Sequence, residues 1–440
     1  MRRKRFVLAG AVCAALAVAG CGSSSSTTPS TSSPAPSSTS STPASTSPAS
    51  TTTTSTSTTS GSGGVLGSPN AASGSPVVFG AINNETNAGA DFPESREAAN
   101  ATVAYLNAYR GGLDGHPIKI DWCITDGTPS VSGACSKKLI AEHPVAILGA
   151  TDLADAVTIP AYKAANLAYL GGMDFTPVES SAPNAVIFND TAQLGNTLAA
   201  LYAVQHLGGK KVAIIALGDT QGEFTADNLW VPAVKSAGGT AKVFPAPPTE
   251  ADLSSIVEAA ISWGPDVIGL ESPSQCVALL TALKSAGWTK PVISIDPCSA
   301  PVTIKAAGGA ANGMYWFQPF QLATTNTQDS QLASAILAKY APAKIAVDSP
   351  SLAEMSTVMD IWSAFHNTAP SKLTTSYILS TLRSGSDHAN FLAEPYTCNG
   401  QAIPAYKAIC NAKYYLYQVK NGQAARIGTT TYDEGTNLIK

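Results

Sequence analysis

Short apolar runs alternate along the chain with longer segments in which apolar residues recur at every third or fourth position. Short apolar runs are typical of strands buried on both faces, and the longer spacing is typical of amphipathic helices. We expect strands over residues 77–82, 118–123, 145–149, 167–170, 211–217, 240–244, 267–270, 291–295, 313–317 and 414–419. We expect helices over residues 93–109, 130–142, 154–165, 194–207, 223–237, 253–262, 276–286, 328–340, 351–366 and 372–383.

These strands and helices alternate in two consecutive series, which begin near residues 77 and 191. Such alternation predicts a parallel sheet with helices on both faces. The chain after residue 75 is long enough for two units of this kind, each with its own core. We therefore predict an α/β protein with two doubly wound parallel-sheet lobes. A turn at Asn421-Gly422 follows the last predicted strand.

The amino terminus has the pattern of an export signal. Basic residues at positions 2–5 precede an apolar run at 6–19, which is too short for a membrane-spanning helix. The motif VAGC at 18–21 resembles a bacterial lipobox, which implies a signal peptide over residues 1–20 and lipidation of Cys21. The alternative is an ordinary secretory signal in which Cys21 is incidental.

A polar tract follows the cysteine. Every residue from 23 to 60 is Ser, Thr, Pro or Ala, a composition that cannot bury enough apolar surface to fold. Residues 21–75 are therefore expected to form a lipid anchor and a disordered tether. This arrangement places the folded part outside the cell, anchored at the outer face of the cytoplasmic membrane.

The charge of the chain changes once the signal is removed. The formal net charge is −4, but the basic residues at 2–5 belong to the signal, so the mature chain is more acidic. Nucleic-acid binding needs a basic face, so nucleic acid is excluded as a partner.

Eight cysteines are present, and Cys13 lies in the signal. With Cys21 assigned to the lipid, six remain in an oxidising compartment and are expected to form disulfides. We favour pairing between sequence neighbours, Cys123–Cys135, Cys276–Cys298 and Cys398–Cys410, although other pairings are formally allowed. The cysteine spacing does not fit a zinc site, and no metal is expected.

Sequence signatures of catalysis are missing. The chain contains no GxGxxG, GxxxxGK[ST], GxSxG or HExxH pattern, and its five histidines are isolated. We expect no cofactor and no enzymatic activity.

Ligands of open parallel sheets bind beyond the carboxyl ends of the strands. The loops that follow the predicted strands are polar and carry acids at Asp91, Asp126, Asp152, Asp174, Asp219, Glu271 and Asp296. Some of these side chains are expected to cap the following helices instead. Two sets of loops that face each other would enclose a polar cleft.

The order of elements resembles the type I periplasmic binding proteins, specifically the leucine/isoleucine/valine-binding family of ABC-transporter substrate-binding lipoproteins. The similarity rests on LNAYRGGLDGHPIKI, VAILGATDLADAV, KVAIIALGDTQGEF, DVIGLESPSQCVALLTALKSAGW and GMYWFQPF. It implies lobes of 76–190 with 318–413 and of 191–317 with 414–440, joined by three hinge strands that cross near 189–191, 314–317 and 415–417. The Cys123–Cys135 pair also resembles a disulfide common in the first lobe of this family.

The resemblance also implies a ligand site. The acid that pairs with a ligand ammonium in this family falls at Asp296, and an aromatic position falls at Phe92. The loop 149–155, which holds the ligand carboxylate in amino-acid binders, has Leu or Ala where a serine is expected. The predicted ligand-binding residues are Phe92, Thr151, Asp152, Asp174, Phe175, Gln221 and Asp296.

Our hypothesis is a lipid-anchored solute-binding protein of an ABC importer, which captures a small polar ligand, an amino acid or another amine-bearing compound, by hinge closure and delivers it to a membrane permease. One alternative is a receptor of the same fold that senses the ligand and signals to a partner. Another is a surface hydrolase, which would require a buried nucleophile–base pair.

Overall fold

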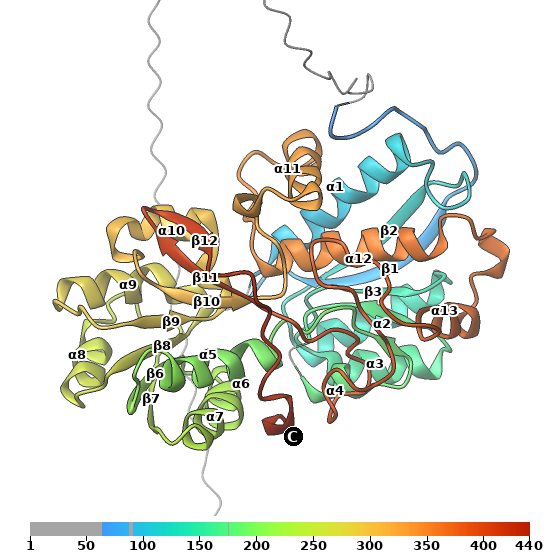
Figure 1. Ribbon diagram of the computed structural model, residues 1–440. Helices are drawn as coiled ribbons and strands as arrows, with labels where there is room; N and C mark the ends of the chain where they lie inside the picture. Colours follow the sequence, from blue (N-terminus) through green and yellow to red (C-terminus); the bar gives the residue numbers. More distant parts are fainter. Residues whose placement is uncertain (1–63, 88–90, 175) are drawn as a thin grey trace, which may run out of the picture. The chain divides into compact units, whose positions relative to one another are not determined.

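The computed structural model describes residues 64–87, 91–174 and 176–440 (Figure 1). The predicted signal peptide, Cys21 and most of the predicted tether lie outside the described residues, as does Phe175. No helix in the described part of the chain is both long and apolar enough to span a membrane.

The first sheet is entirely parallel and has the strand order β2-β1-β3-β4-β5. Its strands are β1 (Val77–Asn84), β2 (Ile118–Thr125), β3 (Ile147–Gly149), β4 (Tyr169–Gly171) and β5 (Ala185–Val186). The helices between them are α1 (Pro93–Tyr109), α2 (Pro129–Ala141), α3 (Asp155–Ala164) and α4 (Pro177–Ser181).

The second sheet has seven strands in the order β12-β11-β10-β9-β8-β6-β7. Its strands are β6 (Lys211–Leu217), β7 (Thr240–Ala246), β8 (Val267–Glu271), β9 (Val292–Ser294), β10 (Tyr315–Gln318), β11 (Tyr415–Lys420) and β12 (Gln423–Arg426). The β10–β11 and β11–β12 pairs are antiparallel, and the other pairs are parallel. Asn421 and Gly422 both have positive φ angles and form the predicted turn between β11 and β12.

The helices of the second series are α5 (Gln193–Gln205), α6 (Thr220–Thr225), α7 (Val231–Ser236), α8 (Ser254–Ser262), α9 (Cys276–Ser285) and α10 (Pro301–Ala307). Three later helices are α11 (Gln328–Tyr340), α12 (Ser349–Phe365) and α13 (Thr375–Leu382). A π-helical turn, η1 (Ala226–Trp230), joins α6 to α7 where the sequence predicts one uninterrupted helix. Short 3₁₀ turns are η2 (Pro273–Gln275), η3 (Asp296–Ser299), η4 (Gly308–Ala310), η5 (Ala323–Thr325), η6 (Pro370–Lys372) and η7 (Thr436–Leu438).

The strands bury both faces, as their apolar runs predict. In β1, Val77, Phe79 and Ala81 belong to one apolar cluster with α1, whereas Ile82 belongs to a second cluster with Leu139 of α2. Successive side chains of a strand point to opposite faces, which produces this division. The α/β architecture with parallel sheets and two lobes is therefore confirmed.

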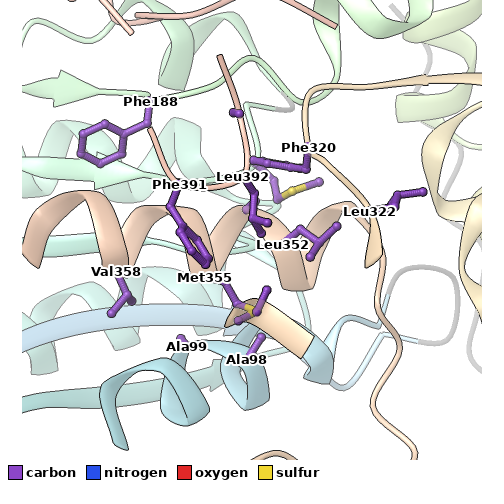
Figure 2. Close-up of a cluster of buried hydrophobic side chains, with 14 of the residues drawn as sticks. Ala98, Ala99, Phe188, Phe320, Leu322, Leu352, Met355, Val358, Phe391 and Leu392 are labelled. Carbon is purple, nitrogen blue, oxygen red and sulfur yellow. The ribbon is translucent and has the colours of Figure 1, made fainter. Parts of the chain in front are cut away.

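Helices from the carboxyl-terminal part of the chain complete the first lobe. Both α11 and α12 pack against α1, although they follow it by more than two hundred residues (Figure 1). Figure 2 shows Met355 and Val358 of α12 toward Ala98 and Ala99 of α1, and Leu352 of the same helix beside Leu392. The spacing of three residues places Met355 and Val358 on neighbouring positions of the face of α12 that contacts α1.

The segments that connect the two lobes are joined by buried polar contacts. Asn189 Oδ1 accepts hydrogen bonds from Asn390 Nδ2 at 2.7 Å and from Asn411 Nδ2 at 2.8 Å. Nearby, the Tyr414 hydroxyl donates to Asp190 Oδ2 at 2.6 Å. The first connection, after β5, therefore lies beside the third, before β11.

The other two predicted crossing points need a correction in position. Residues 315–317 and 415–417 pair with each other as β10 and β11, for example Trp316 with Tyr417. Antiparallel pairing inside the second sheet keeps both segments in that lobe. The chain therefore crosses after β10 and before β11.

The described part of the chain contains three disulfides, and they join the expected neighbours. Cys123 of β2 bonds to Cys135 of α2, Cys276 of α9 to Cys298 of η3, and Cys398 to Cys410. The Cys276–Cys298 bond connects the segments that follow β8 and β9.

Candidate functional site

A cavity of about 170 Å³ lies at the carboxyl ends of strands from both sheets. The first lobe contributes residues that follow β1, β3 and β4, and the second lobe contributes residues at the ends of β6, β8 and β9. This position is the one that parallel-sheet topology predicts for a ligand.

The walls of the cavity are largely apolar. Phe92, Leu153 and Met173 line it from the first lobe, and Leu217 and Phe317 line it from the second. Apolar walls with a few polar groups are typical of small-molecule sites, since the walls bind the ligand body and the polar groups orient it.

Phe92 reaches the cavity because its backbone is fixed on both sides. Its N–H donates to Asn84 O at 2.9 Å, and its carbonyl accepts from Asn83 Nδ2 at 2.8 Å. Pro93 then begins α1. Proline is favourable as a first helical residue because it has no N–H that would need a hydrogen-bond partner. Phe92, predicted from the resemblance, thus lines the cavity beside the start of α1.

Asp296, the predicted partner of a ligand ammonium, also lines the cavity. It follows β9 and is only 6% exposed. Ser299 Oγ donates to its Oδ1 at 2.8 Å, while Oδ2 has no hydrogen-bond partner among the described residues. Burial raises the pKa of this carboxyl from 3.8 to about 6, and the Ser299 hydrogen bond opposes the rise.

Gln221 lines the cavity from α6, together with Asp219, the residue that caps this helix. Asp219 Oδ1 accepts from the Gly222 N–H at 2.8 Å, which is an ordinary N-cap bond. Helix capping, one of the two roles expected for the loop acids, therefore applies to Asp219.

Thr151, Asp152 and Asp174 do not line the cavity, in contrast to the prediction. All three are buried and bonded to the protein itself. Thr151 Oγ1 lies 3.1 Å from Ser95 Oγ. Asp152 accepts from the Ala154 N–H and from the Thr158 hydroxyl, and so fixes the turn before α3.

Asp174 connects the loop after β4 to the first interlobe connection. Its Oδ1 accepts from the Thr191 N–H at 2.7 Å and from the Thr191 hydroxyl at 2.6 Å. Burial and the neighbouring Asp190 raise the pKa of Asp174 well above its usual range. Asp174 therefore supports Thr191, which does line the cavity.

Glu271 is a cavity residue that the predicted ligand set omitted. It is the last residue of β8, is 7% exposed, and its Oε2 has no hydrogen-bond partner among the described residues. Burial, and next the charge of Asp219, raise the pKa of Glu271 well above 4.5. Glu271 is one of the acids that follow predicted strands, and this position is the sequence feature that could have identified it as a cavity residue.

The electrostatic surroundings of the cavity are acidic. No Lys, Arg or His is among the described residues that line it. Asp348, the N-cap of α12, is buried near Asp296, and its pKa is raised by burial and then by the charges of Glu94 and Asp296. Among the described residues, no group of three or more His, Cys, Asp or Glu side chains could hold a metal ion.

Comparison with known proteins identifies one sequence family that matches this chain and several solved structures with a similar fold. The sequence model described as "Periplasmic binding protein" matches residues 76–424. Comparison with curated protein sequences gives no match.

Three solved structures illustrate the similarity of fold. A leucine-binding protein from Thermotoga maritima is 14% identical with a TM-score of 0.66, over 80% of this chain and 98% of that chain. A solute-binding protein of an ABC transporter from Rhodopseudomonas palustris HaA2, in complex with p-hydroxybenzoic acid, is 18% identical with a TM-score of 0.69, over 82% and 99%. A fatty acid ABC transporter substrate-binding protein from Thermomonospora curvata is 17% identical with a TM-score of 0.68, over 84% and 95%.

Proposed function

The chain belongs to the periplasmic binding protein family, and on that premise we propose that it is a lipid-anchored component of an ABC importer that captures a small amine-bearing ligand. Family membership makes it an extracytoplasmic solute-binding protein rather than an enzyme. The ligand class, the lipid anchor and the permease partner are our proposal.

We infer an amine-bearing ligand from one observation: the cavity is lined by a buried acid, and no basic side chain is among its described lining residues. Asp296 lines the cavity, its buried Oδ2 has no hydrogen-bond partner among the described residues, and no basic side chain is among the described lining residues. A ligand ammonium would donate a charge-assisted hydrogen bond to this oxygen. It would also offset the cost of burying the charge.

The cavity is unfavourable for a ligand whose polar end is a carboxylate. Leu153 and Met173 line it on the side where amino-acid binders are expected to hold the ligand carboxylate. Asp219 and Asp296 would repel a second negative charge. We therefore propose that the ligand combines an amine with an apolar body that packs on Phe92 and Leu153.

Capture is proposed to occur by closure of the two lobes, 76–190 with 319–413 and 191–318 with 414–440, where Gln318 joins the second lobe because it pairs with Tyr415. Side chains of both lobes line the same cavity, so a bound ligand contacts both. The ligand stabilises the closed state only to the extent that it binds that state more tightly than the open state.

Delivery to a permease follows from the proposed anchor. A lipid on Cys21 would hold the protein at the membrane. Residues 70–74 hydrogen-bond to the backbone of residues 107, 108 and 115, so the tether we propose ends before them, and about 40 residues of flexible chain would have a root-mean-square reach of about 35 Å. This reach would keep the loaded protein within range of a permease in the same membrane.

A thermal-shift panel tests the proposed ligand class. Primary amines with apolar bodies should raise the melting temperature of the mature chain, whereas the corresponding carboxylates and neutral sugars should not. A ligand at one hundred times its Kd stabilises the folded state by about 2.7 kcal/mol, which is a measurable shift. Stabilisation by carboxylates alone, or by no compound, would contradict the proposal.

A further inference from the structure

Two buried aspartates lie at the point where the chain first leaves the first lobe. Asp174 belongs to the loop after β4, Asp190 belongs to the connection between β5 and α5, and both are 0% exposed. Asp174 Oδ1 lies 2.7 Å from the backbone nitrogen of Thr191, the residue directly after Asp190, which holds the two acids close together. Two ionised carboxylates buried side by side would repel each other and lose their hydration.

One oxygen of each carboxyl group is occupied by donors from the protein. Asp174 Oδ1 accepts from the Thr191 N–H at 2.7 Å and from the Thr191 hydroxyl at 2.6 Å. Asp190 Oδ2 accepts from the Leu194 N–H at 2.8 Å and from the Tyr414 hydroxyl at 2.6 Å. These bonds fix the orientation of both carboxyl groups.

The other two oxygens, Asp174 Oδ2 and Asp190 Oδ1, are buried and accept no hydrogen bond from any donor among the described residues. The two carboxyl groups lie within hydrogen-bond reach of each other. Because an ionised carboxylate can only accept, a hydrogen bond between them requires a proton on one of them. No described salt bridge includes either acid, so no basic side chain of the described residues pairs with them.

We propose that Asp174 and Asp190 share one proton, which Asp174 donates to Asp190, and that this proton fixes Thr191 in the wall of the ligand cavity. The shared proton ties the loop after β4 to the first interlobe connection. Through Tyr414 the same network reaches the third connection, before β11. Asp174 and Asp190 are therefore positioning residues, whose role does not depend on which ligand binds.

The surroundings assign the proton to Asp174. Burial, and next the charge of Asp190, raise the pKa of Asp174 well above 3.8. Burial also raises the pKa of Asp190, but the hydrogen bond with Asp174 opposes that rise. Among the described residues, Tyr406 and Tyr414 are the titratable groups that feel both acids, and burial raises the pKa of each above 10, so they stay protonated near neutral pH.

The shared proton makes stability depend on pH in a defined direction. In the unfolded chain Asp174 loses its proton near pH 3.8, whereas in the folded chain it keeps the proton to a much higher pH. The stability that the proton provides is therefore lost as the pH rises through the folded pKa. Asparagine imitates the protonated acid, because its N–H donates where the shared proton does and its oxygen can still accept from Thr191.

Melting temperatures of the mature chain between pH 5 and pH 9 test the shared proton. Asp174→Asn should gain on wild type as the pH rises, by about 2 °C or more at pH 9. Asp174→Ala should melt below Asp174→Asn at every pH, because it leaves the two Thr191 donors without their acceptor. An Asp174→Asn advantage that does not change with pH would overturn the inference.

The double variant Asp174→Asn with Asp190→Asn tests the pairing itself. A single asparagine donates to the remaining carboxylate, but two asparagines direct two N–H donors at each other, because their oxygens are held by other donors. The double variant should melt at least about 5 °C below the value expected from the two single variants. Asp174→Asn with Asp227→Asn, whose second site is exposed on η1, is the matched control and should be additive.

Hydrogen–deuterium exchange of the peptide that contains Thr191 tests the positioning role. The Thr191 amide should be protected in wild type and in Asp174→Asn, and it should exchange at least about tenfold faster in Asp174→Ala. Additive melting temperatures in the double variant would refute the shared proton. Unchanged exchange of Thr191 in Asp174→Ala would refute its role in positioning the cavity wall.

Discussion

Replacing Asp296 with asparagine should stabilise the empty protein at neutral pH while weakening its binding of amines. The carboxyl is buried, and burial raises its pKa from 3.8 to about 6. Asparagine has nearly the same shape and keeps an oxygen that can accept the Ser299 hydrogen bond. The substitution therefore removes a buried charge with little change in packing.

The size and sign of the effect follow from proton binding. Below pH 3.8 the carboxyl is protonated in both the folded and the unfolded chain, and it adds no penalty. Between pH 3.8 and about 6 only the folded chain keeps the proton, so stability falls as the pH rises. Above this window the full penalty remains, and it amounts to about 3 kcal/mol.

Urea unfolding of wild type and Asp296→Asn across this pH range measures the effect. The variant should be about 3 kcal/mol more stable near pH 8, and the difference should shrink toward zero near pH 4. Asp227→Asn, at an exposed position of η1, is the matched control for the loss of one carboxylate and should leave the free energy of unfolding unchanged. A variant no more stable than wild type at pH 8, or an advantage that is constant with pH, would refute the reasoning.

Three further substitutions test the framework around the cavity. Removing the Cys276–Cys298 disulfide by Cys276→Ala with Cys298→Ala should lower the free energy of unfolding by about 2–5 kcal/mol and weaken amine binding. An unchanged melting temperature would contradict a stabilising role of this disulfide. Leu352→Ala should cost about 2–5 kcal/mol, since it opens a cavity between α12 and its neighbours, and a loss below 1 kcal/mol in urea would count against that packing (Figure 2). Asn189→Ala should cost about 1–3 kcal/mol because it leaves the buried amides of Asn390 and Asn411 without this acceptor, and equal melting temperatures would contradict the network.

The sequence predicts the elements well where local pattern and burial agree. The predicted helix over residues 93–109 is α1, and the apolar run at 211–217 is β6, because helical periodicity and a continuous apolar run are local signals. The short helix α4 and the two-residue strand β5 were not predicted, since elements of that length are fixed by tertiary contacts.

The site was only partly predictable, because an acid after a strand can serve two purposes. Asp152 and Asp296 both follow strands and look alike in sequence. In the structure, Asp152 accepts from the Thr158 hydroxyl and the Ala154 N–H, whereas Asp296 lines the cavity and its Oδ2 has no hydrogen-bond partner among the described residues. The role of each acid depends on residues that are far away in the sequence but close in the folded structure. The same is true of the position of Glu271 in the wall of the cavity.

A crystal structure of the mature chain with pentylamine would test the central claim most directly. The account predicts the amine nitrogen within hydrogen-bond distance of Asp296 Oδ2, with the alkyl chain against Phe92 and Leu153. A pentylamine molecule bound elsewhere, or one in this cavity with its nitrogen directed away from Asp296, would contradict it.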